Sequence, residues 1–361
     1  MNPSYWRGKR VFITGHTGFK GSWLCLMLTS LGARVAGYAL EPPTQPNLFS
    51  LARVADVVES TKGDVRDLEA LSACVRGFAP DVVFHMAAQS VVLASYDEPA
   101  DTYSTNVMGT VNLLEAVRRL KRPCVVVNVT TDKCYENKGW VWGYRETDTL
   151  GGHDPYSNSK ACAELVGQCY RDSFFPTSRF AEHGVAIASA RAGNVVGGGD
   201  WTFRQLIPET IAAFLRSQSV SLRHPQAVRP WQHVLDCLGG YMHLAEALAD
   251  DAVQHAGGWN FGPADADTRT VSHVVEALAL HWGIERPWVQ DQAAHAPEAQ
   301  QLRLDVNKAA SLLRWRCHLP IDEALTWVAS WYRAFHSKAD PLDLCREQIS
   351  GYVKRMEATR S

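Results

Sequence analysis

The chain has 361 residues, of which 36 are Lys or Arg and 38 are Asp or Glu, so its formal net charge is -2. This balance leaves no basic surplus with which to hold a polyanion such as DNA, and it argues against a nucleic-acid-binding protein. Hydrophobic residues make up 46% of the chain, but they are dispersed, and no apolar stretch reaches the roughly 18 residues of a membrane-spanning helix.

The nine cysteines and 13 histidines show neither disulfide-type nor metal-type spacing. The cysteine count is odd and no Cys-x-x-Cys pair occurs, which is typical of reduced thiols in a cytosol. No His-Glu-x-x-His or similar cluster occurs, so we expect no metal. The first ten residues lead into a predicted strand without a secretory apolar segment. We therefore expect a cytoplasmic protein.

Short β-branched runs alternate with longer helical patterns in the first half of the chain. A helix is expected over residues 22–31, and Asp67 is typical of the N-cap of another. Strands are expected, in chain order, at residues 11–13, 34–38, 57–60, 81–85, 125–129 and 185–188. Strands that alternate with helices of this length indicate βαβ units. The predicted fold class is therefore α/β, with a Rossmann-like doubly wound parallel sheet.

The sequence pattern changes from about Gly193. Three glycines, Gly197 to Gly199, precede Asp200 and Trp201 in a predicted loop, and the later segments are rich in helix patterns. We expect one domain over residues 1–190 and a smaller, discontinuous C-terminal substrate lobe over residues 191–361. Some of the later segments are expected to return to the first domain.

A glycine-rich turn follows the first predicted strand and opens the first helix. Its glycines have the spacing Gly-x-x-Gly-x-x-Gly. Such a turn brings backbone N–H groups close to a pyrophosphate at a helix N-terminus. The residues predicted to bind a dinucleotide here are Gly15, Thr17, Gly18, Phe19 and Lys20. For Lys20 a solvated position on the first turn of the helix is an equal alternative.

The second strand lacks the acidic residue that usually contacts the adenosine ribose. Ala39 occupies the expected position, and Glu41 lies two residues further on. Asp64 and Val65 follow the third predicted strand, and Asp64 is a candidate contact for the adenine amine. The missing acid leaves the choice between NAD and NADP open at the level of residues.

Tyr156 and Lys160 lie four residues apart in a predicted helix, so they share one face. A nearby ammonium favours the phenolate, which lets a tyrosine act as a base near neutral pH. Thr131, Asp132 and Lys133 follow the predicted strand 125–129, and a doubly wound sheet places its chemistry beyond the carboxyl ends of such strands. We predict that these five side chains meet in one crevice, although a Tyr-x-x-x-Lys spacing alone also occurs on ordinary helix surfaces.

Four motifs occur in order along the chain. They are Gly15-x-x-Gly18-x-x-Gly21, His85-Met86-Ala87-Ala88-Gln89, Asn106-Val107-Met108-Gly109-Thr110 and Tyr156-x-x-x-Lys160. Together they resemble the extended short-chain dehydrogenase/reductases, the NAD-dependent epimerase/dehydratase family, which act on nucleotide sugars. The resemblance covers nearly the whole chain.

Thr131-Asp132 is similar to the Thr/Ser-Asp-Glu of the sugar-nucleotide 4,6-dehydratases in that family, except that Lys133 replaces the glutamate. Residues 15–24, 131–135 and 193–201 resemble the branch of these dehydratases that acts on CDP-glucose. The resemblance implies NAD as cofactor, CDP-glucose as substrate, and a homo-oligomer, dimer or tetramer. It also implies a lyase that contributes deoxy sugars to a surface polysaccharide such as the O-antigen.

The resemblance further implies roles for residues outside the catalytic set. Ala87, Ala88 and Gln89 would line the ribose on the nicotinamide side, and Asn106 would support the helix that carries Tyr156. Packing of loops and helices is the alternative interpretation of these four residues.

The implied reaction is a redox-neutral elimination. Tyr156, supported by Lys160, would take the proton of the sugar 4-hydroxyl, to which Thr131 would hydrogen-bond. The resulting 4-keto group acidifies the C5–H bond, and Asp132 would donate a proton to the departing 6-hydroxyl. Lys133 would be the C5 base only as a neutral amine, which burial and a neighbouring cation favour. Otherwise it would stabilise the enolate while another group removes the proton.

Most of the predicted substrate-binding residues follow the sixth predicted strand in the chain. The resemblance places Arg191 and Asn194 at the phosphates of the sugar nucleotide. Because a guanidinium can bind a diphosphate through two hydrogen bonds, further candidates are Arg204, Arg229 and Arg303, each of which can equally form a surface ion pair. Ser90 and Thr131 complete the set.

Two other functions remain open. A 4-epimerase shares the tyrosine, the lysine and the cofactor but needs no acid for a 6-hydroxyl, so Asp132 discriminates between them. A non-catalytic regulator that binds NAD or a nucleotide sugar is the other alternative. The retention of Thr131, Tyr156 and Lys160 argues against it.

Overall fold

A computed structural model describes residues 1–293 and 302–358. Its centre is a seven-stranded sheet in which every neighbouring pair is parallel. In spatial order the strands are β11 (Gly257–Phe261), β6 (Val185–Ala192), β5 (Cys124–Val129), β4 (Val82–His85), β1 (Arg10–Thr14), β2 (Arg34–Ala39) and β3 (Glu59–Lys62). This arrangement confirms the predicted Rossmann-like, doubly wound fold.

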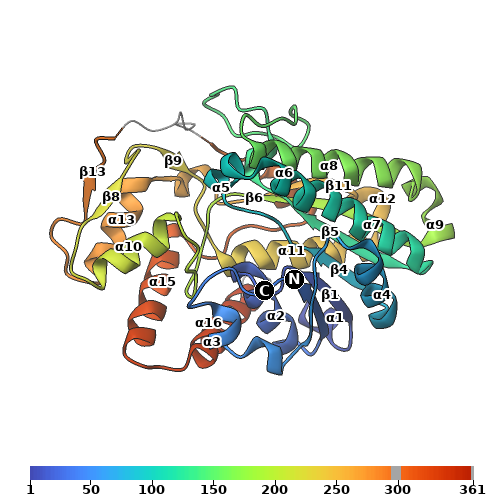
Figure 1. Cartoon of the computed structure of the whole chain (residues 1–361), viewed down its shortest axis with the longest axis horizontal. Coiled ribbons are helices and arrows are strands. Elements are labelled where there is room, and N and C mark those ends of the chain that lie inside the picture. Colours follow the sequence, from blue (N-terminus) through green and yellow to red (C-terminus); the bar gives the residue numbers. More distant parts are fainter. Residues whose placement is uncertain (294–301, 359–361) are drawn as a thin grey trace.

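Helices cover both faces of the sheet (Figure 1). One face carries α2 (Phe19–Ser30), α11 (Val234–Asp250) and α16 (Pro341–Ala358). The other carries α4 (Leu68–Phe78), α7 (Gly109–Leu120) and α8 (Pro155–Ser173). Successive residues of a strand point to opposite faces, so in β1 Val11 and Ile13 join one hydrophobic core and Phe12 joins the other.

A second lobe lies beyond one end of the sheet, on the left of Figure 1. It contains α10 (Leu206–Phe214), α13 (Val271–Leu280) and α15 (Ile321–His336). Its two-stranded sheets pair β7 (Val195–Val196) with β10 (Gln232–His233), β8 (Val220–Leu222) with β13 (Trp288–Gln290), and β9 (Val228–Arg229) with β12 (Arg269–Thr270).

Shorter elements connect these parts. Short α-helices are α1 (Pro3–Trp6), α3 (Leu48–Leu51), α5 (Val92–Asp97), α6 (Pro99–Tyr103), α9 (Phe180–His183), α12 (Ala252–His255) and α14 (Asn307–Leu312). The 3-10 helices are η1 (Val54–Asp56), η3 (Asp132–Cys134), η4 (Thr177–Arg179) and η5 (Asp265–Asp267), and η2 (Ser104–Met108) is a π-helix. Within the described residues, no helix combines the length and the apolar character needed to span a bilayer.

The structure corrects three predicted boundaries. The first helix begins at Phe19 rather than near residue 22, because the glycine turn itself provides the N-cap, Gly18. The third strand begins two residues later than predicted, and all four of its residues are exposed, so it lacks an apolar pattern. The sixth strand continues to Ala192, through the polar but buried Ser189 and Arg191. Two later elements contact the main sheet: α11 packs on it and β11 extends it.

Candidate active site

The helix α8 places Tyr156 and Lys160 against the carboxyl end of β5. Asp154 caps the helix by accepting a hydrogen bond from the Ser157 backbone N–H at 2.8 Å, and Pro155 occupies the first turn, as helix N-termini favour. Tyr156 and Lys160 are both buried. The Lys160 ammonium donates to the backbone oxygen of Val129, the last residue of β5, at 3.0 Å. The i and i+4 spacing therefore directs both side chains into one site.

Thr131 links the tyrosine to the neighbouring acid. Thr131 caps η3, accepting from the Lys133 backbone N–H at 3.3 Å, and its hydroxyl donates to Asp132 Oδ1 at 3.0 Å. The Thr131 hydroxyl is also hydrogen-bonded to Tyr156. Thr131 therefore lies between Tyr156 and Asp132, and its one hydroxyl proton is donated to the acid. The structure thus brings these side chains together, with Lys133 half-buried on the same turn.

Asp132 has one carboxylate oxygen that no group in the described part of the chain satisfies. Asp132 is 2% exposed, and its Oδ2 atom is buried without a hydrogen-bond partner in the structure. A Cβ atom at Gly193 would lie 2.7 Å from this oxygen. A buried, unsatisfied carboxylate oxygen is costly. It therefore marks a position for a proton or for a polar group of a ligand.

Burial is the largest influence on the pKa values of Tyr156 and Lys160. Burial raises the pKa of Tyr156, and the hydrogen bond with Thr131 opposes the shift only in part. Burial, followed by the charge of Lys20, lowers the pKa of Lys160 to about 8, while Glu164 opposes this. Desolvation is thus the largest influence on Tyr156 in the protein alone, and the expectation that the Lys160 ammonium makes Tyr156 a phenolate near neutral pH stays a prediction.

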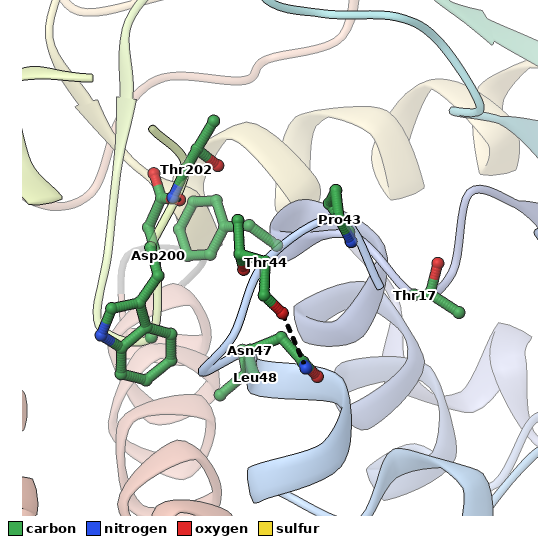
Figure 2. A pocket seen from close by; sticks show the side chains of 10 residues that line it. Thr17, Pro43, Thr44, Asn47, Leu48, Asp200 and Thr202 are labelled. Atoms are coloured by element: carbon green, nitrogen blue, oxygen red, sulfur yellow. Dashed lines mark hydrogen bonds between the residues drawn. The ribbon is translucent and has the colours of Figure 1, made fainter. Parts of the chain in front are cut away.

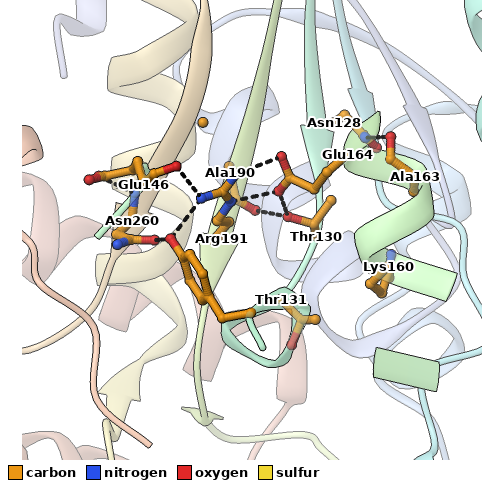
Figure 3. Close-up of polar contacts among 12 residues, drawn as sticks. Asn128, Thr130, Thr131, Glu146, Lys160, Ala163, Glu164, Ala190, Arg191 and Asn260 are labelled. Atoms are coloured by element: carbon orange, nitrogen blue, oxygen red, sulfur yellow. Dashed lines mark hydrogen bonds and ion pairs between the residues drawn. The ribbon is translucent and has the colours of Figure 1, made fainter. Parts of the chain in front are cut away.

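Glu164 and Arg191 form a buried ion pair near Thr131 and Lys160 (Figure 3). Arg191 Nε and Nη2 donate to the two oxygens of Glu164 at 2.9 and 3.1 Å, and Nη1 donates to the Tyr135 hydroxyl at 2.7 Å. Thr130 donates its hydroxyl to Glu164 Oε1 at 2.5 Å. The guanidinium is thus engaged inside the protein, which argues against the predicted contact of Arg191 with substrate phosphates.

Glu164 and Thr130 were not among the predicted site residues. Glu164 lies four residues after Lys160 on α8, so the spacing 156, 160, 164 places three ionisable side chains on one helical face. This spacing is the sequence feature from which Glu164 could have been predicted as a site residue. A carboxylate on a buried face requires a cation, and the structure supplies Arg191 from β6.

The glycine turn packs tightly against the segment after β4. Gly15 has a φ of +76°, and a Cβ atom there would lie 2.7 Å from the Ala87 backbone nitrogen. Only glycine fits this position without strain. Gly18 caps α2 without a side-chain hydrogen bond, so the first N–H groups of a 12-residue helix are left for a ligand, as a pyrophosphate requires. This loop therefore fits a dinucleotide.

Hydrogen bonds of a buried asparagine connect the segment after β4 to the neighbouring helices. Asn106, in the π-helix η2, accepts from the Gln89 backbone N–H at 2.9 Å and donates to Gln89 O at 3.0 Å and to Ser159 Oγ at 2.8 Å. Ser159 precedes Lys160 on α8. The segment Ala87–Ala88–Gln89 is therefore joined to α8 through Asn106, and the predicted supporting role of Asn106 stays a prediction.

A pocket adjoins the glycine turn where the two lobes meet (Figure 2). Its lining residues are Thr17, Phe19, Pro43, Thr44, Asn47, Leu48, Gly199, Asp200, Trp201 and Thr202. Thr17 donates its hydroxyl to the Leu40 backbone oxygen at 2.9 Å, and Asn47 donates to Thr44 O at 3.0 Å. The segment after β2 is thus folded toward the loop 197–201 of the second lobe.

The adenosine end of the predicted cofactor site has two notable features. β2 ends at Ala39, and Glu41 forms an exposed ion pair with Lys62 at 2.7 Å. Asp64 is paired with Arg66 at 2.6 Å, which lowers the pKa of the Asp64 carboxyl, while the next residue, Val65, is buried. The side chain of Asp64 is therefore already engaged, and its expected bond to the adenine amine stays a prediction.

The other predicted substrate-binding residues differ in how deeply they are buried. Asn194 Oδ1 and Arg303 Nε are buried and have no hydrogen-bond partner among the residues that the structure describes, which suits contacts to a ligand. Arg229 is buried in β9, and its Nη1 donates to the Val228 backbone oxygen at 2.9 Å. Arg204 is exposed beside the Phe203 ring, and Ser90 is exposed after β4. Asn194 and Arg303 are thus the best placed of these candidates.

Comparison with known proteins agrees with this geometry. A family model described as GDP-mannose 4,6 dehydratase matches residues 12–327. The chain is 49% identical over 353 residues to a CDP-glucose 4,6-dehydratase of Salmonella typhimurium, covering 98% of each chain. It is 27% identical to a dTDP-glucose 4,6-dehydratase of Streptomyces antibioticus, covering 92% of this chain and 95% of the relative.

Solved structures show the same fold. A dTDP-glucose 4,6-dehydratase from Streptomyces venezuelae, with NAD and TYD bound, has a TM-score of 0.78 and 25% identity, covering 92% of this chain and 99% of that one. A UDP-glucose 4-epimerase from Brucella ovis in complex with NAD has a TM-score of 0.77 at 20% identity, covering 90% and 98%. The second likeness supports the fold alone.

Proposed function

The chain belongs to the GDP-mannose 4,6-dehydratase family of extended short-chain dehydrogenase/reductases, and on that premise we propose that it dehydrates CDP-D-glucose to CDP-4-keto-6-deoxy-D-glucose. It would act as a hydro-lyase with NAD as cofactor. The choice of a cytidine nucleotide is supported by the 49% identity to a CDP-glucose 4,6-dehydratase across 98% of both chains.

One observation carries the proposed reaction type. It is the hydrogen-bond chain from Tyr156 through Thr131 to Asp132, which supports a reaction in which Tyr156 would handle the 4-hydroxyl proton and Asp132 would serve as the acid for the 6-hydroxyl. An epimerase has no use for the second group. The buried Oδ2 of Asp132 has no hydrogen-bond partner within residues 1–293 and 302–358, so it is the atom from which a proton would pass to the leaving hydroxyl.

The cofactor would supply the oxidation: bound NAD accepts a hydride from the sugar and later returns it. Gly15 and Gly18 would hold its pyrophosphate at the N-terminus of α2, and Ala87, Ala88 and Gln89 would border the nicotinamide ribose. Tyr156 would take the proton of the 4-hydroxyl while Thr131 orients that hydroxyl. Lys160, fixed to Val129 O, would hold its ammonium beside the tyrosine.

Lys133 is proposed to act at C5 of the sugar, either by removing the C5 proton or by stabilising the negative charge of the enolate. It stands on the turn that follows Asp132, half-buried. Either it removes the C5 proton as a neutral amine, or it stabilises the enolate as a cation while another group takes the proton. Both roles require an amine at this position, and a variant without it separates oxidation from elimination.

The second lobe, residues 191–361 with the exception of the segments that return to the sheet, is proposed to bind the sugar nucleotide. Asn194 and Arg303 would contact it through their unpartnered atoms. We also propose a cytoplasmic location, in agreement with nine free cysteines. A homo-oligomer and a role in surface polysaccharide synthesis are proposed from the family resemblance.

The test is a product assay. The protein is incubated with NAD and, in turn, CDP-, dTDP-, UDP- and GDP-glucose or the matching hexose, and the 4-keto-6-deoxy product is measured. With C4-deuterated CDP-glucose we expect the label on the new C6 methyl group. A C4 epimer as the product would establish the epimerase instead, and absence of any conversion with bound NAD would favour a regulator.

A further inference from the structure

A short segment, residues 302–305, packs directly against the elements that carry the catalytic residues. Leu302 and Leu304 are buried, whereas Arg303 between them is half-buried. The two leucines belong to one small hydrophobic core, whose other buried members are Cys134, Tyr135, Tyr144 and Ala161. Through Cys134 this core borders η3, and through Ala161 it borders α8. The segment is therefore anchored on both elements of the proposed active site.

The same packing decides which way Arg303 points. The Tyr144 backbone N–H donates to the Arg303 backbone oxygen at 2.9 Å, and Leu304 forms a parallel bridge with Tyr144. Successive side chains of such an extended segment point to opposite sides, so Arg303 points away from the small core. Arg303 is one of the residues proposed to contact the sugar nucleotide. Its distance from the catalytic residues is therefore set by the groups that hold residues 302–305 in place.

The amide of Asn260 joins this segment to the residue that ends η3 (Figure 3). Asn260 lies in β11 and is fully buried. Its Nδ2 atom donates to the backbone oxygens of Tyr144 and Asp305, at 2.8 and 3.0 Å. Its Oδ1 atom accepts from the Tyr135 hydroxyl at 2.6 Å. An amide has two N–H donors and one acceptor oxygen, so each of these groups of Asn260 is in use.

The donors and acceptors of this network allow one orientation of the amide. The two backbone oxygens can only accept hydrogen bonds, so the NH2 group of Asn260 must face them. The Tyr135 hydroxyl must then donate to Oδ1, and it is left to accept from Arg191 Nη1 at 2.7 Å. Arg191 is in turn paired with Glu164 on α8. One continuous network therefore runs from α8 through Tyr135 and Asn260 to the segment that carries Arg303.

The carboxylate of Asp132 depends on this network for its place. Among the described residues it accepts one hydrogen bond, from Thr131 at Oδ1, and its Oδ2 atom has no partner. With so little support of its own, the carboxylate is placed largely by the backbone of η3. That helix ends at Tyr135, whose ring stacks on Tyr144 at 5.4 Å between the ring centres and whose hydroxyl is bonded to Asn260.

We propose that Asn260 is a positioning residue for the dehydration, which through Tyr135 keeps Arg303 at a fixed separation from Asp132. This inference rests on the proposed function, in which Arg303 contacts the diphosphate and Asp132 the 6-hydroxyl of one sugar nucleotide. The diphosphate held by Arg303 then delivers the 6-hydroxyl to the acid, so that binding energy from the nucleotide orients the sugar. Asn260 itself contacts no reacting atom.

The kinetic test uses Tyr135→Phe, which removes the link to Asn260 but keeps the ring that stacks on Tyr144. Arg191 Nη1 still donates to the Glu146 backbone oxygen at 3.2 Å. We expect kcat for the 4-keto-6-deoxy product to fall by roughly ten- to a hundred-fold, as for a small displacement of a bound substrate. The dissociation constant of CDP should change by less than about two-fold, since the loss falls on the transition state. Asn260→Leu should lower kcat at least as much.

The control and a double-mutant cycle separate positioning from a general loss of structure. Tyr352→Phe removes another buried phenol hydroxyl, on α16 at the opposite face of the sheet from α8, and should leave kcat unchanged. In the background of Arg303→Met, Tyr135→Phe should lower kcat by less than about three-fold further, because coupled residues give non-additive effects. Additive losses, or a wild-type kcat in Tyr135→Phe, would overturn the inference.

Hydrogen exchange measured by mass spectrometry gives a readout that needs no turnover. The probe is CDP, which lacks the glucose that would touch η3 directly. In the wild-type protein CDP should slow exchange in peptides over residues 130–136 as well as 302–306, because the network joins the two segments. In Tyr135→Phe only the second protection should remain. Protection limited to 302–306 in the wild-type protein would contradict the inference. Both protections in a protein that yields no 4-keto product would refute the dehydratase proposal alone, and failure to bind CDP refutes both.

Discussion

Removing Arg191 is expected to destabilise the fold rather than only to weaken nucleotide binding. Arg191 and Glu164 are each 5% exposed in their side chains. Glu164 accepts two hydrogen bonds from Arg191 and one from Thr130. Removing one partner of a buried ion pair leaves the other charge uncompensated, at a cost of ~3–5 kcal/mol. We therefore expect Arg191→Met to lower the free energy of unfolding by about that amount.

Urea denaturation followed by circular dichroism measures this loss, provided that the m-value stays constant. A matched control is Arg179→Met, which breaks an exposed pair with Glu182 whose side chains are 64% and 59% exposed. This change should cost less than ~1 kcal/mol. The combined change Glu164→Leu with Arg191→Met should recover part of the loss, because no charge is then left buried. A cost for Arg191→Met equal to that of the control, together with a raised KM for CDP-glucose, would show that Arg191 serves the substrate after all.

Three further outcomes are expected. Asp132→Asn should still oxidise C4 but should lose ~10²- to 10⁴-fold in elimination, measured as 4-keto-6-deoxy product; normal turnover would favour an epimerase. Lys133→Ala should likewise keep C4 oxidation and lose elimination, and solvent deuterium exchange at C5 at the wild-type rate would contradict its role. Burial raises the pKa of Asp236 to about 7 from 3.8, so the folded state holds an extra proton. Relative to Asp236→Asn, the wild-type protein should then lose ~1.4 kcal/mol of stability per unit as the pH rises from 5 to 7, and parallel stability curves for the two proteins would refute this assignment.

The elements that sequence patterns located well are those whose side chains are buried in register. The six residues of β5 are all buried, and all but Asn128 are apolar. The predicted bounds of this strand agree with the structure to within one residue. β3 has no such pattern, since it is an exposed edge strand recognisable only by its backbone pairing with β2. Edge strands carry little side-chain information, so their register depends on tertiary contacts.

The candidate site divides in the same way. The approach of Thr131, Asp132, Tyr156 and Lys160 follows from local rules, namely the end of a parallel strand and the helical i and i+4 spacing. The partner of Arg191 does not follow from such rules, because Glu164 lies 27 residues away on another element. An arginine after a buried strand is equally compatible with a phosphate and with an internal carboxylate, and only packing decides between them. The protonation of Tyr156 likewise depends on its degree of burial, which a spacing motif does not reveal.

Two adjacent threonines explain why the buried ion pair and the catalytic chain are mechanically linked. Thr131 has an extended backbone, with φ of -150° and ψ of 157°, and successive side chains of an extended segment point in opposite directions. Thr130 therefore reaches Glu164 while Thr131 reaches Tyr156 and Asp132. The Thr130 hydroxyl fixes the segment to the helix that carries Tyr156 and Lys160, and the Thr131 hydroxyl joins Tyr156 and Asp132. Glu164, two helical turns from Tyr156, thus fixes the position of Thr131 without contact with any reacting atom.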